Sequence, residues 1–461
     1  MKIVKFFTLG CKVNQYDTQS IRESLLKGRY KEINSNARVK ADVNIINTCT
    51  VTHRADSGSL SLIRRARREN PSAKIVVTGC LAGLDKDKIR RVCADCLIVE
   101  NKDKNKIAGL LGVCQGDNGV FQSGRMKGAP PGLKHGVTKG GILEAAKAHP
   151  CLEGQGSWPQ KYNFSGRTRA FLKVQDGCDN FCSYCKVPLV RGRSKSRAFN
   201  KVITEAEQLV NNGFKEIVLT GICLGSYGKD LRPASKLVDL IGDIEKIKGL
   251  FRLRLSSIEA GDVTSGLIKK IAKSKIICPH LHIPLQSGDS GILKLMNRSY
   301  VPADYIKLIE RLKKSVQNIS ITTDVLVGFP FETEENFKNT LRLIKKIMPL
   351  KVHIFPYSPR PGTYAGRNFT VQVLPQVIKE RVRVLHNLAD KCSFLYRSQF
   401  LGKKIIALIE AKCRDNPIYW EGHTGNYMKV RVKSKKNLKN QLICVKLKRI
   451  EGDFFFSDKI D

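Results

Sequence analysis

Short hydrophobic runs alternate with amphipathic stretches through most of the chain. Near the N-terminus, the runs 2–10, 41–48 and 73–79 are rich in Val, Ile and Phe and are separated by helix-sized intervals. This alternation predicts an amino-terminal α/β domain with a parallel sheet. A cysteine follows each run directly, namely Cys11, Cys49 and Cys80. Because parallel strands end at one edge of their sheet, we expect the three thiols to converge there.

A second set of hydrophobic runs occupies residues 170–360 at similar intervals. These six runs cover residues 170–175, 216–221, 251–257, 280–286, 321–329 and 351–358. Repeated βα units of this number predict a parallel sheet curved into a partial (β/α)6 barrel, with an active site at the strand ends. Beyond about residue 398, short β-rich runs joined by Gly- and Asn-bearing turns predict a small β-barrel.

These patterns divide the chain into four parts. We predict an amino-terminal domain over 1–113, a linker or insertion over 114–165, the partial barrel over 166–397 and the small β-barrel over 398–461. The segment 114–165 is rich in Gly, Lys, Ala and Pro, although residues 142–148 could form a short helix. Several domains are expected because 461 residues exceed what one hydrophobic core usually serves.

Composition adds an electrostatic and a redox argument. The 81 Lys and Arg residues against 41 Asp and Glu give a net charge of +40, which attracts polyanions and makes nucleic acid a candidate partner. A lysine-rich proteome would give the same charge without specifying a partner. No apolar run reaches the roughly 18 residues of a membrane helix, and no signal-peptide cleavage site follows Met1, so a cytoplasmic protein is expected. In that compartment, 15 cysteines indicate metal ligation more than disulfides.

The most specific motif is CxxxCxxC, formed by Cys178, Cys182 and Cys185 directly after the first barrel run. Three thiolates on one loop can bind three corners of a cubane iron-sulfur cluster and leave one iron open to a ligand. A structural zinc site or inert thiols are the alternatives, but the paired CxxC knuckles typical of structural zinc are missing from this segment.

With its aromatic residue, Tyr184, this motif resembles the signature of the radical S-adenosylmethionine superfamily. In that superfamily the open iron binds the amino and carboxylate groups of S-adenosylmethionine, and the aromatic residue lies near the adenine. The resemblance implies reductive cleavage of S-adenosylmethionine to methionine and a 5'-deoxyadenosyl radical, which can abstract hydrogen from an unactivated C–H bond.

Further motifs extend the resemblance over nearly the whole chain. The segments TLGCKVNQYDT, INTCTVTHRAD, VVTGC, RLRLSSIE, HLHIPLQSGD and DVLVGFPFET are similar to those of the methylthiotransferase family. The family implies a second 4Fe-4S cluster on Cys11, Cys49 and Cys80, two equivalents of S-adenosylmethionine per turnover, and a carboxyl-terminal TRAM domain that binds RNA. It also implies an electron donor such as flavodoxin or ferredoxin and a sulfur source.

Within the family, GCKVNQYDT, NTCTVT and VRGRSKSR most resemble the branch that acts on N6-threonylcarbamoyladenosine at position 37, beside the tRNA anticodon, and forms its 2-methylthio derivative. The same chemistry on isopentenyladenosine in tRNA or on a ribosomal-protein aspartate is an alternative. A more distant alternative is an RNA-binding protein whose clusters serve only structure or electron transfer.

The resemblance also nominates individual contacts. Residues near predicted strand ends are expected to line the S-adenosylmethionine and substrate pocket, although a cap or turn role is the alternative for each: Thr220, Gly221, Glu259, Gln286, Ser287, Asp324 and Gly328. We hypothesise that Arg191, Arg193 and Arg197 contact tRNA phosphate or the threonyl carboxylate, because guanidinium groups bind oxyanions bidentately; a solvated loop is the alternative. His280 and His282 are interpreted as core residues that satisfy hydrogen bonds.

Three features depart from the family pattern: two single positions, and the linker from Cys114 to Ser165, which is long. Cys223 stands where this branch is expected to have His, and Phe331 stands where Gly is usual. The detail of the cofactor loops is therefore less securely transferred than the cysteine ligands.

Overall fold

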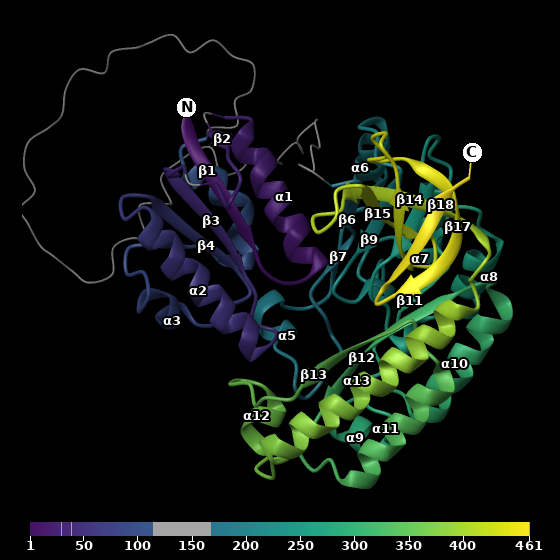
Figure 1. The fold of residues 1–461 in the computed structure, drawn as a ribbon. Helices are drawn as coiled ribbons and strands as arrows, with labels where there is room; N and C mark the ends of the chain where they lie inside the picture. Colours follow the sequence, from purple (N-terminus) through teal and green to yellow (C-terminus); the bar gives the residue numbers. More distant parts are fainter. Residues whose placement is uncertain (29, 38, 114–166, 461) are drawn as a thin grey trace, which may run out of the picture.

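The computed structural model describes residues 1–28, 30–37, 39–113 and 167–460 (Figure 1). Within these ranges an α/β layer, a curved βα sheet and a closed β-barrel follow one another along the chain. The predicted linker 114–165, with the short helix considered for 142–148, lies outside the described residues. No helix of the described ranges has the length and apolar character needed to cross a membrane.

The amino-terminal part is a five-stranded, all-parallel sheet with the order β2-β1-β3-β4-β5. Its strands are β1 (Lys2–Thr8), β2 (Tyr30–Glu32), β3 (Val43–Thr48), β4 (Lys74–Gly79) and β5 (Leu97–Ile98). Its helices are α1 (Lys12–Leu26), α2 (His53–Glu69), α3 (Lys86–Arg90) and α4 (Ile107–Leu110), with the 3-10 helix η1 (Asn101–Lys106). The predicted parallel α/β domain is thus confirmed.

Alternation along these strands places hydrophobic side chains on both faces of the sheet. Phe6 of β1 packs on the face that α1 covers, whereas its neighbour Phe7 packs on the face that α2 covers. Helix α2 begins where the Thr52 hydroxyl accepts a hydrogen bond from the Ala55 amide at 3.1 Å, which satisfies one free N–H of the first turn. Burial on both faces fixes the register and therefore fixes where each strand ends.

The central part contains six parallel strands in the order predicted. They are β6 (Arg169–Lys173), β9 (Glu216–Thr220), β10 (Arg252–Leu255), β11 (His280–His282), β12 (Ser320–Val327) and β13 (Lys351–Pro356). Parallel bridges from Leu253 to Ile277 and from Ser257 to His282 join the sheet β10-β9-β6 to the sheet β11-β12-β13. This arrangement confirms the partial (β/α)6 barrel.

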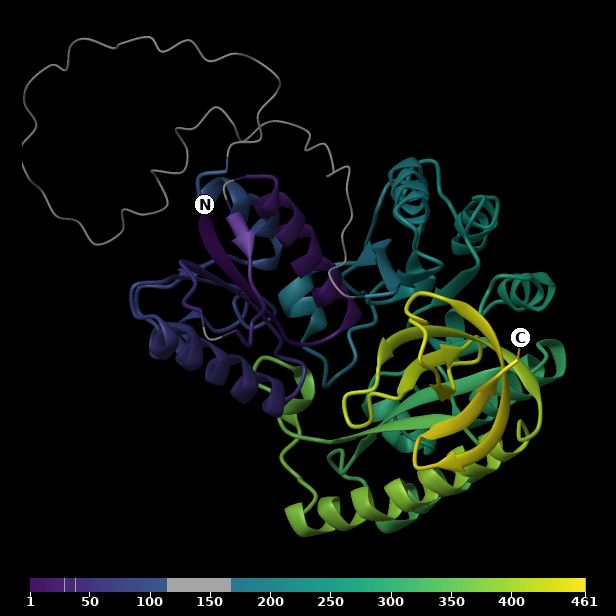
Figure 2. The ribbon, with the colours of Figure 1, turned by 45° about the horizontal axis from the view of Figure 1, so that its top comes forward.

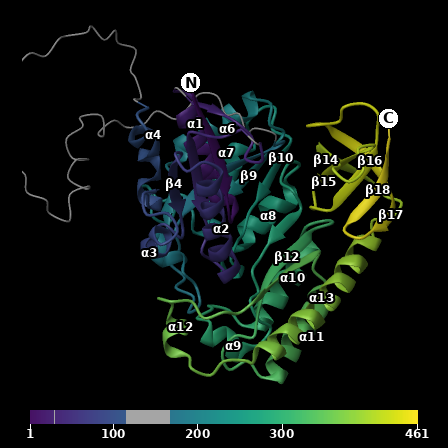
Figure 3. The ribbon, with the colours of Figure 1, turned by 60° about the vertical axis from the view of Figure 1, so that its left-hand side comes forward.

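Helices cover the outer side of this curved sheet (Figure 3). They are α6 (Phe199–Asn211), α7 (Leu237–Ile244), α8 (Ser265–Lys273), α9 (Ser290–Leu295), α10 (Pro302–Ser315) and α11 (Glu334–Ile347). Shorter elements near the strand ends are β7 (Gln175–Asp176), α5 (Val187–Arg191), β8 (Lys195–Ser196), η4 (Leu224–Ser226), η5 (Ala260–Asp262) and α12 (Tyr364–Asn368). Helix α13 (Pro375–Ser398) packs beside α11 and leads to the last part of the chain.

The carboxyl-terminal part is a closed barrel with the order β14-β15-β16-β18-β17. Its strands are β14 (Lys404–Lys412), β15 (Tyr419–Thr424), β16 (Lys429–Lys433), β17 (Leu442–Glu451) and β18 (Phe454–Lys459). Inward residues such as Val430 and Val445 form its separate hydrophobic core. The predicted small β-barrel is confirmed, and closure leaves no strand edge unpaired.

The closed barrel lies against the curved sheet (Figure 2). Two arginines of β10 attach the one to the other. Arg254, which is 0% exposed, pairs with Glu216 at 2.7 Å and donates a hydrogen bond to the Gly425 carbonyl at 2.9 Å. Arg252 donates to the carbonyls of Ile406 at 2.7 Å and His423 at 3.0 Å. The hairpin between β15 and β16 is thereby held against the inside of the curved sheet.

Asp17 of α1 attaches the amino-terminal part. Its buried carboxylate accepts Lys104 at 2.5 Å, Lys173 at 2.6 Å and Arg191 at 3.5 Å, and the last two residues belong to the central part. Burial alone would raise the pKa of Asp17, but these three cations outweigh it and hold the pKa below its usual value. The strand ends of the two parts are consequently fixed relative to one another.

Candidate active site

The three cysteines of the amino-terminal part lie at one edge of its sheet. Cys11, Cys49 and Cys80 follow β1, β3 and β4, which are adjacent strands, and all three thiols are free. The backbone before Cys11 lies close to the Cys49 side chain. A Cβ atom on Gly10, which has φ +98°, would lie 3.0 Å from Cys49 Sγ. Burial, with the neighbouring thiols of Cys80 and Cys11, raises the pKa of Cys49 to about 12. Burial also raises the pKa of Cys80. A bound cation would favour the thiolate forms of Cys49 and Cys80, as it does for metal ligands.

The second set of cysteines occupies the loop between β7 and α5. Each sulfur has a nitrogen donor within reach: Asn180 N lies 3.5 Å from Cys178 Sγ, and Val187 N lies 3.4 Å from Cys185 Sγ. Arg298 Nη1 lies 3.2 Å from Cys182 Sγ. N–H donors aimed at sulfur stabilise thiolates and clusters bound by them. The donor set fits a cubane cluster held by three cysteines.

Arg298, which was not predicted from the sequence, links this loop to Glu259. Its side chain is 4% exposed, makes an ion pair with Glu259 and lies 3.2 Å from the Tyr300 hydroxyl. Burial raises the pKa of Glu259, and the guanidinium offsets part of that rise. The predicted cofactor residue Glu259 therefore orients an arginine that faces the cysteine loop.

Cys223 also lies against this loop. Its thiol is hydrogen-bonded to Cys178, which lowers the pKa of Cys178 even though burial opposes the shift. The Cys223 sulfur also accepts the Ser226 hydroxyl at 3.2 Å. The position at which the sequence departs from the family pattern is thus in contact with a predicted cluster ligand.

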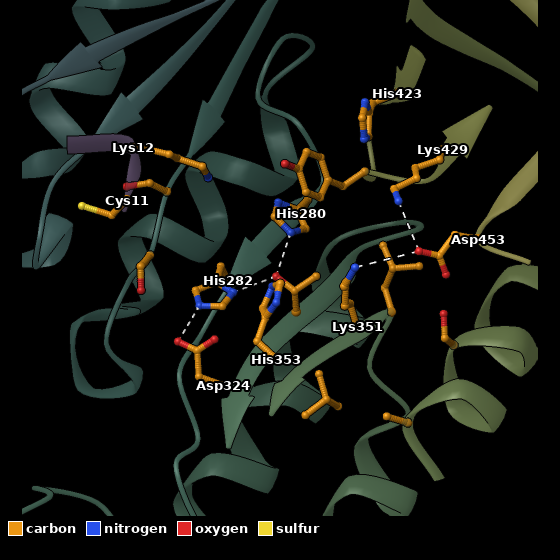
Figure 4. Close-up of a pocket in the computed structure, with 18 of the residues that line it drawn as sticks. Cys11, Lys12, His280, His282, Asp324, Lys351, His353, His423, Lys429 and Asp453 are labelled. Carbon is orange, nitrogen blue, oxygen red and sulfur yellow. Dashed lines mark hydrogen bonds and ion pairs between the residues drawn. The ribbon is translucent and has the colours of Figure 1, made fainter. Parts of the chain in front are cut away.

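A cavity of about 900 Å³ opens where the three parts of the chain meet (Figure 4). Its walls come from the loop after β1, the ends of β9 and β10, the inner face of β11 to β13, and the hairpin between β15 and β16. Four of the predicted site residues line it, namely Cys11, Thr220, Gly221 and Asp324. Thr220 and Gly221 contribute the end of β9, where Gly221 N lies 3.3 Å from Ser256 Oγ.

The other predicted cofactor contacts are not among the described residues that line this cavity: Tyr184, Glu259, Gln286, Ser287 and Gly328. The Tyr184 ring packs edge-on against Phe329, with 6.3 Å between ring centroids.

Three of these residues have partners that explain them structurally. Gln286, with φ +66°, pairs through its backbone with β12. Ser287 Oγ accepts the Asp289 amide at 3.2 Å. Gly328 has φ +75°, and a Cβ there would lie 2.4 Å from Ile378. The geometry favours the turn and packing roles that were the alternatives for these three positions.

The two histidines that were interpreted as hydrogen-bonded core residues do make hydrogen bonds, and both also line the cavity. His280 is buried, with Nε2 3.0 Å from Thr322 Oγ1. His282 Nε2 lies 3.1 Å from Asp324 Oδ2, and its Nδ1 lies 2.9 Å from Thr322 Oγ1. Together with His353, which was not predicted, His282 and Asp324 bring three potential metal-ligating atoms within 4.8 Å of one another. Because they occupy the inner face of adjacent strands, they can equally donate to or accept from a bound nucleobase.

The hairpin of the closed barrel forms the wall opposite Cys11 (Figure 4). The Tyr427 ring is stacked between His280, at 4.6 Å between centroids, and His423, at 5.0 Å. Arg254 lies over the same ring at 4.6 Å from its centroid. No motif in the sequence indicated this aromatic stack, because its rings come from two separate parts of the chain.

The three predicted RNA-binding arginines have different surroundings. Arg191 has a side chain that is 1% exposed and pairs with Asp176 at 2.8 Å, and Arg197 pairs with Glu205 at 2.6 Å. Both guanidinium groups are used inside the protein, contrary to the expectation of an RNA contact. Arg193 is 77% exposed and remains accessible to a polyanion.

Both cysteine sets lie in regions of the chain that match models of known protein families. Residues 3–99 match the model described as "Uncharacterized protein family UPF0004", and residues 172–344 match the Radical SAM superfamily. The chain is 37% identical over 450 residues to the threonylcarbamoyladenosine tRNA methylthiotransferase MtaB of Bacillus subtilis (strain 168), covering 97% of this chain and 94% of the relative. It is 31% identical to a tRNA-2-methylthio-N(6)-dimethylallyladenosine synthase of Lachnoclostridium phytofermentans, covering 98% and 94%.

A solved structure resembles the fold. It is that of the radical S-adenosylmethionine methyltransferase TsrM from Kitasatospora setae, with a TM-score of 0.53 and 15% identity, and the match covers 79% of this chain and 74% of that one.

Proposed function

The chain belongs to the radical S-adenosylmethionine tRNA methylthiotransferases, and on this premise we propose that it uses two 4Fe-4S clusters to methylthiolate N6-threonylcarbamoyladenosine at position 37 of tRNA. Cys178, Cys182 and Cys185 would hold the cluster to which S-adenosylmethionine binds. Cys11, Cys49 and Cys80 would hold the auxiliary cluster. Residues 398–461 would serve as the TRAM-like RNA-binding domain.

The observation that supports this proposal is the fixed relation of the two cysteine sets. Arg191 pairs with Asp176, two residues before Cys178, and its guanidinium is also hydrogen-bonded to Cys80. Arg191 and Asp17 therefore join the cysteine loop of the curved sheet to the cysteine edge of the parallel sheet. A reaction that needs two metal centres around one acceptor carbon requires such a rigid junction.

The overall reaction consumes two molecules of S-adenosylmethionine. One would supply the methyl group and leave as S-adenosylhomocysteine. The other would be cleaved with one electron to methionine and a 5'-deoxyadenosyl group, which would leave as 5'-deoxyadenosine with the hydrogen of C2. The same number of electrons, one, would be released again when the carbon-sulfur bond forms. The C2–H bond of the adenine breaks and a C2–SCH₃ bond forms, with sulfur from an external or cluster source. A flavodoxin or ferredoxin would provide electrons, and the enzyme would work in the cytoplasm with its tRNA.

The protein's own residues position the reacting groups. Arg298 holds Cys182 and Glu259 in place. The cavity, with His282 and Asp324 on its inner face, offers hydrogen bonds to the base. The accessible Arg193 would contact the tRNA backbone.

The test is anaerobic incubation of reconstituted enzyme with reductant, S-adenosylmethionine and tRNA carrying threonylcarbamoyladenosine, followed by mass spectrometry of the nucleosides. Wild type should give the 2-methylthio product. A variant with Cys178, Cys182 and Cys185 all replaced by Ala should lose cleavage of S-adenosylmethionine, whereas one with Cys11, Cys49 and Cys80 replaced should retain cleavage but form no product. Product on isopentenyladenosine alone would contradict the proposed acceptor, and absence of cleavage would contradict the radical assignment.

A further inference from the structure

The cavity contains one lysine that differs from its other cations. Lys351 and Lys429 both reach Asp453, at 3.9 and 3.2 Å, and Arg397 donates to the Gly452 carbonyl at 2.6 Å. For Lys12, the described part of the chain supplies neither a hydrogen bond nor an ion pair. Lys12 is half-buried in the wall of the cavity. An ammonium group that loses part of its water without gaining an anion is destabilising, so we expect a ligand to supply the anion.

The position of Lys12 defines what that ligand must be. Lys12 is the first residue of α1, directly after Cys11, and its ammonium points into the cavity (Figure 4). Helix α1 has no acidic residue in its first turn, so the helix dipole is not neutralised there and adds to the positive potential. A small anion next to Cys11 would pair with the Lys12 ammonium and would also neutralise the positive end of the α1 dipole.

We propose that Lys12 is the subsite for the carboxylate of the threonylcarbamoyl group and that it determines the choice of nucleoside. This inference rests on the proposed function. In the adenine ring, C2 and the carbon that bears N6 both flank N1, so a base whose C2 faces the cysteine edge presents its N6 substituent along the same edge. The carboxylate of that substituent then lies within reach of the residue that follows Cys11.

Lys12 replaces the arginines first considered for this role. Arg191 and Arg197 are already paired with carboxylates of the protein, and their charges are not available to a substrate. A nucleoside with a neutral N6 substituent, such as isopentenyl, would leave the Lys12 ammonium unpaired. A site that must satisfy a buried polar group discriminates strongly against an analogue that lacks the partner.

The test compares anticodon stem-loop RNAs that carry either threonylcarbamoyladenosine or unmodified adenosine at position 37. Binding to reconstituted holoenzyme is measured by fluorescence anisotropy, and methylthio product is measured by mass spectrometry. In Lys12→Met the preference for the threonylcarbamoyl RNA over the unmodified RNA should fall by about tenfold or more. Lys12→Arg should restore most of the preference because it restores the positive charge.

The iron content of both variants is measured, so that preferences are compared only between preparations that hold both clusters. Lys27→Met, at the exposed end of the same helix, is the matched control for loss of one positive charge and should keep the wild-type preference. An unchanged preference in Lys12→Met, with product still formed by wild type, would overturn the carboxylate subsite alone. Absence of product from wild type on the threonylcarbamoyl RNA would instead overturn the proposed function.

Discussion

Arg298 donates a hydrogen bond from Nη1 to Cys182 Sγ at 3.2 Å, from a side chain that is 4% exposed. A cation in this position stabilises the more negative, reduced form of a cluster bound by Cys182. We expect Arg298→Gln to lower the midpoint potential of that cluster, because it removes the charge and weakens the contact. A hydrogen bond to a charged group contributes about 1.5–3 kcal/mol, which corresponds to roughly 60–130 mV for one electron.

The potential is to be measured by a redox titration followed by electron paramagnetic resonance. The auxiliary cysteine set is replaced by Ala in this experiment, so that one cluster is observed. Arg383→Gln, an exposed arginine of α13 paired with Glu380, is the control and should leave the potential unchanged. Equal potentials in Arg298→Gln and wild type would show that Arg298 does not act on the cluster.

The ion pair between Glu216 and Arg254 predicts a pH dependence of stability. Burial opposes ionisation of Glu216, but Arg254 outweighs it and lowers the pKa from 4.5 to about 2. A carboxyl group with a lowered folded pKa stabilises the protein at pH values above about 4.5, and this stabilisation is lost as the pH falls toward 2. The shift corresponds to about 3 kcal/mol.

Glu216→Gln should therefore reduce the free energy of unfolding of the apoprotein by about 3 kcal/mol at pH 7. Urea unfolding at a series of pH values checks the expectation, since the wild type and the variant should approach one another below pH 4.5. A difference that is constant from pH 7 to pH 3 would rule out the titration of Glu216 as its cause.

Asp17 predicts how strongly the amino-terminal part is attached. Asp17→Asn removes the buried carboxylate that Lys104, Lys173 and Arg191 share, and leaves these cations with Asp176. Breaking a buried charge pair in this way costs about 3–5 kcal/mol. The unfolding midpoint of the apoprotein in urea should fall accordingly, whereas the exposed control Asp87→Asn should change it little. If the unfolding midpoint of Asp17→Asn lies within error of that of the wild type, water takes the place of the Asp17 carboxylate in the variant.

Arg193 predicts a measurable electrostatic contribution to RNA binding. Its exposed guanidinium also lies over the Phe181 ring, at 4.8 Å from the centroid, and so is held near the cysteine loop. Arg193→Ala should weaken tRNA binding and reduce the slope of log affinity against log salt concentration by about 1. Affinity is to be measured over a range of KCl concentrations, with Arg383→Ala as the charge-matched control. Unchanged affinity and turnover would exclude a phosphate contact by Arg193.

The edges of the sheets could be predicted from sequence because the hydrophobic runs end abruptly at chemically distinctive residues. Cys11, Cys49 and Cys80 each follow such a run, and the parallel order of neighbouring strands then places them together. The local spacing of Cys178, Cys182 and Cys185 needs no tertiary information at all. These features depend on short-range patterns, which a single sequence contains.

The remaining site residues depend on long-range proximity and could not be predicted in the same way. Arg298 and Tyr427 stand in segments with no distinctive pattern, and their roles appear only when separate parts of the chain meet. Arg191 was predicted to contact RNA because its burial between Asp176 and Asp17, which lies 174 residues earlier, depends on the meeting of two separate parts of the chain. Phe331 has φ +67°, which explains why Gly is usual at this position but could not be inferred from Phe itself.

The hairpin around Tyr427 has a consequence for how such enzymes can diversify or be redesigned. The hairpin belongs to the closed barrel, which is expected to bind RNA. It also supplies one wall of the cavity in which the base would react. Exchanging the closed barrel between relatives would therefore exchange part of the cavity wall together with the RNA-binding surface. Chimeras will therefore work only when residues 423–429 are retained or are changed together with the inner residues of β11 to β13.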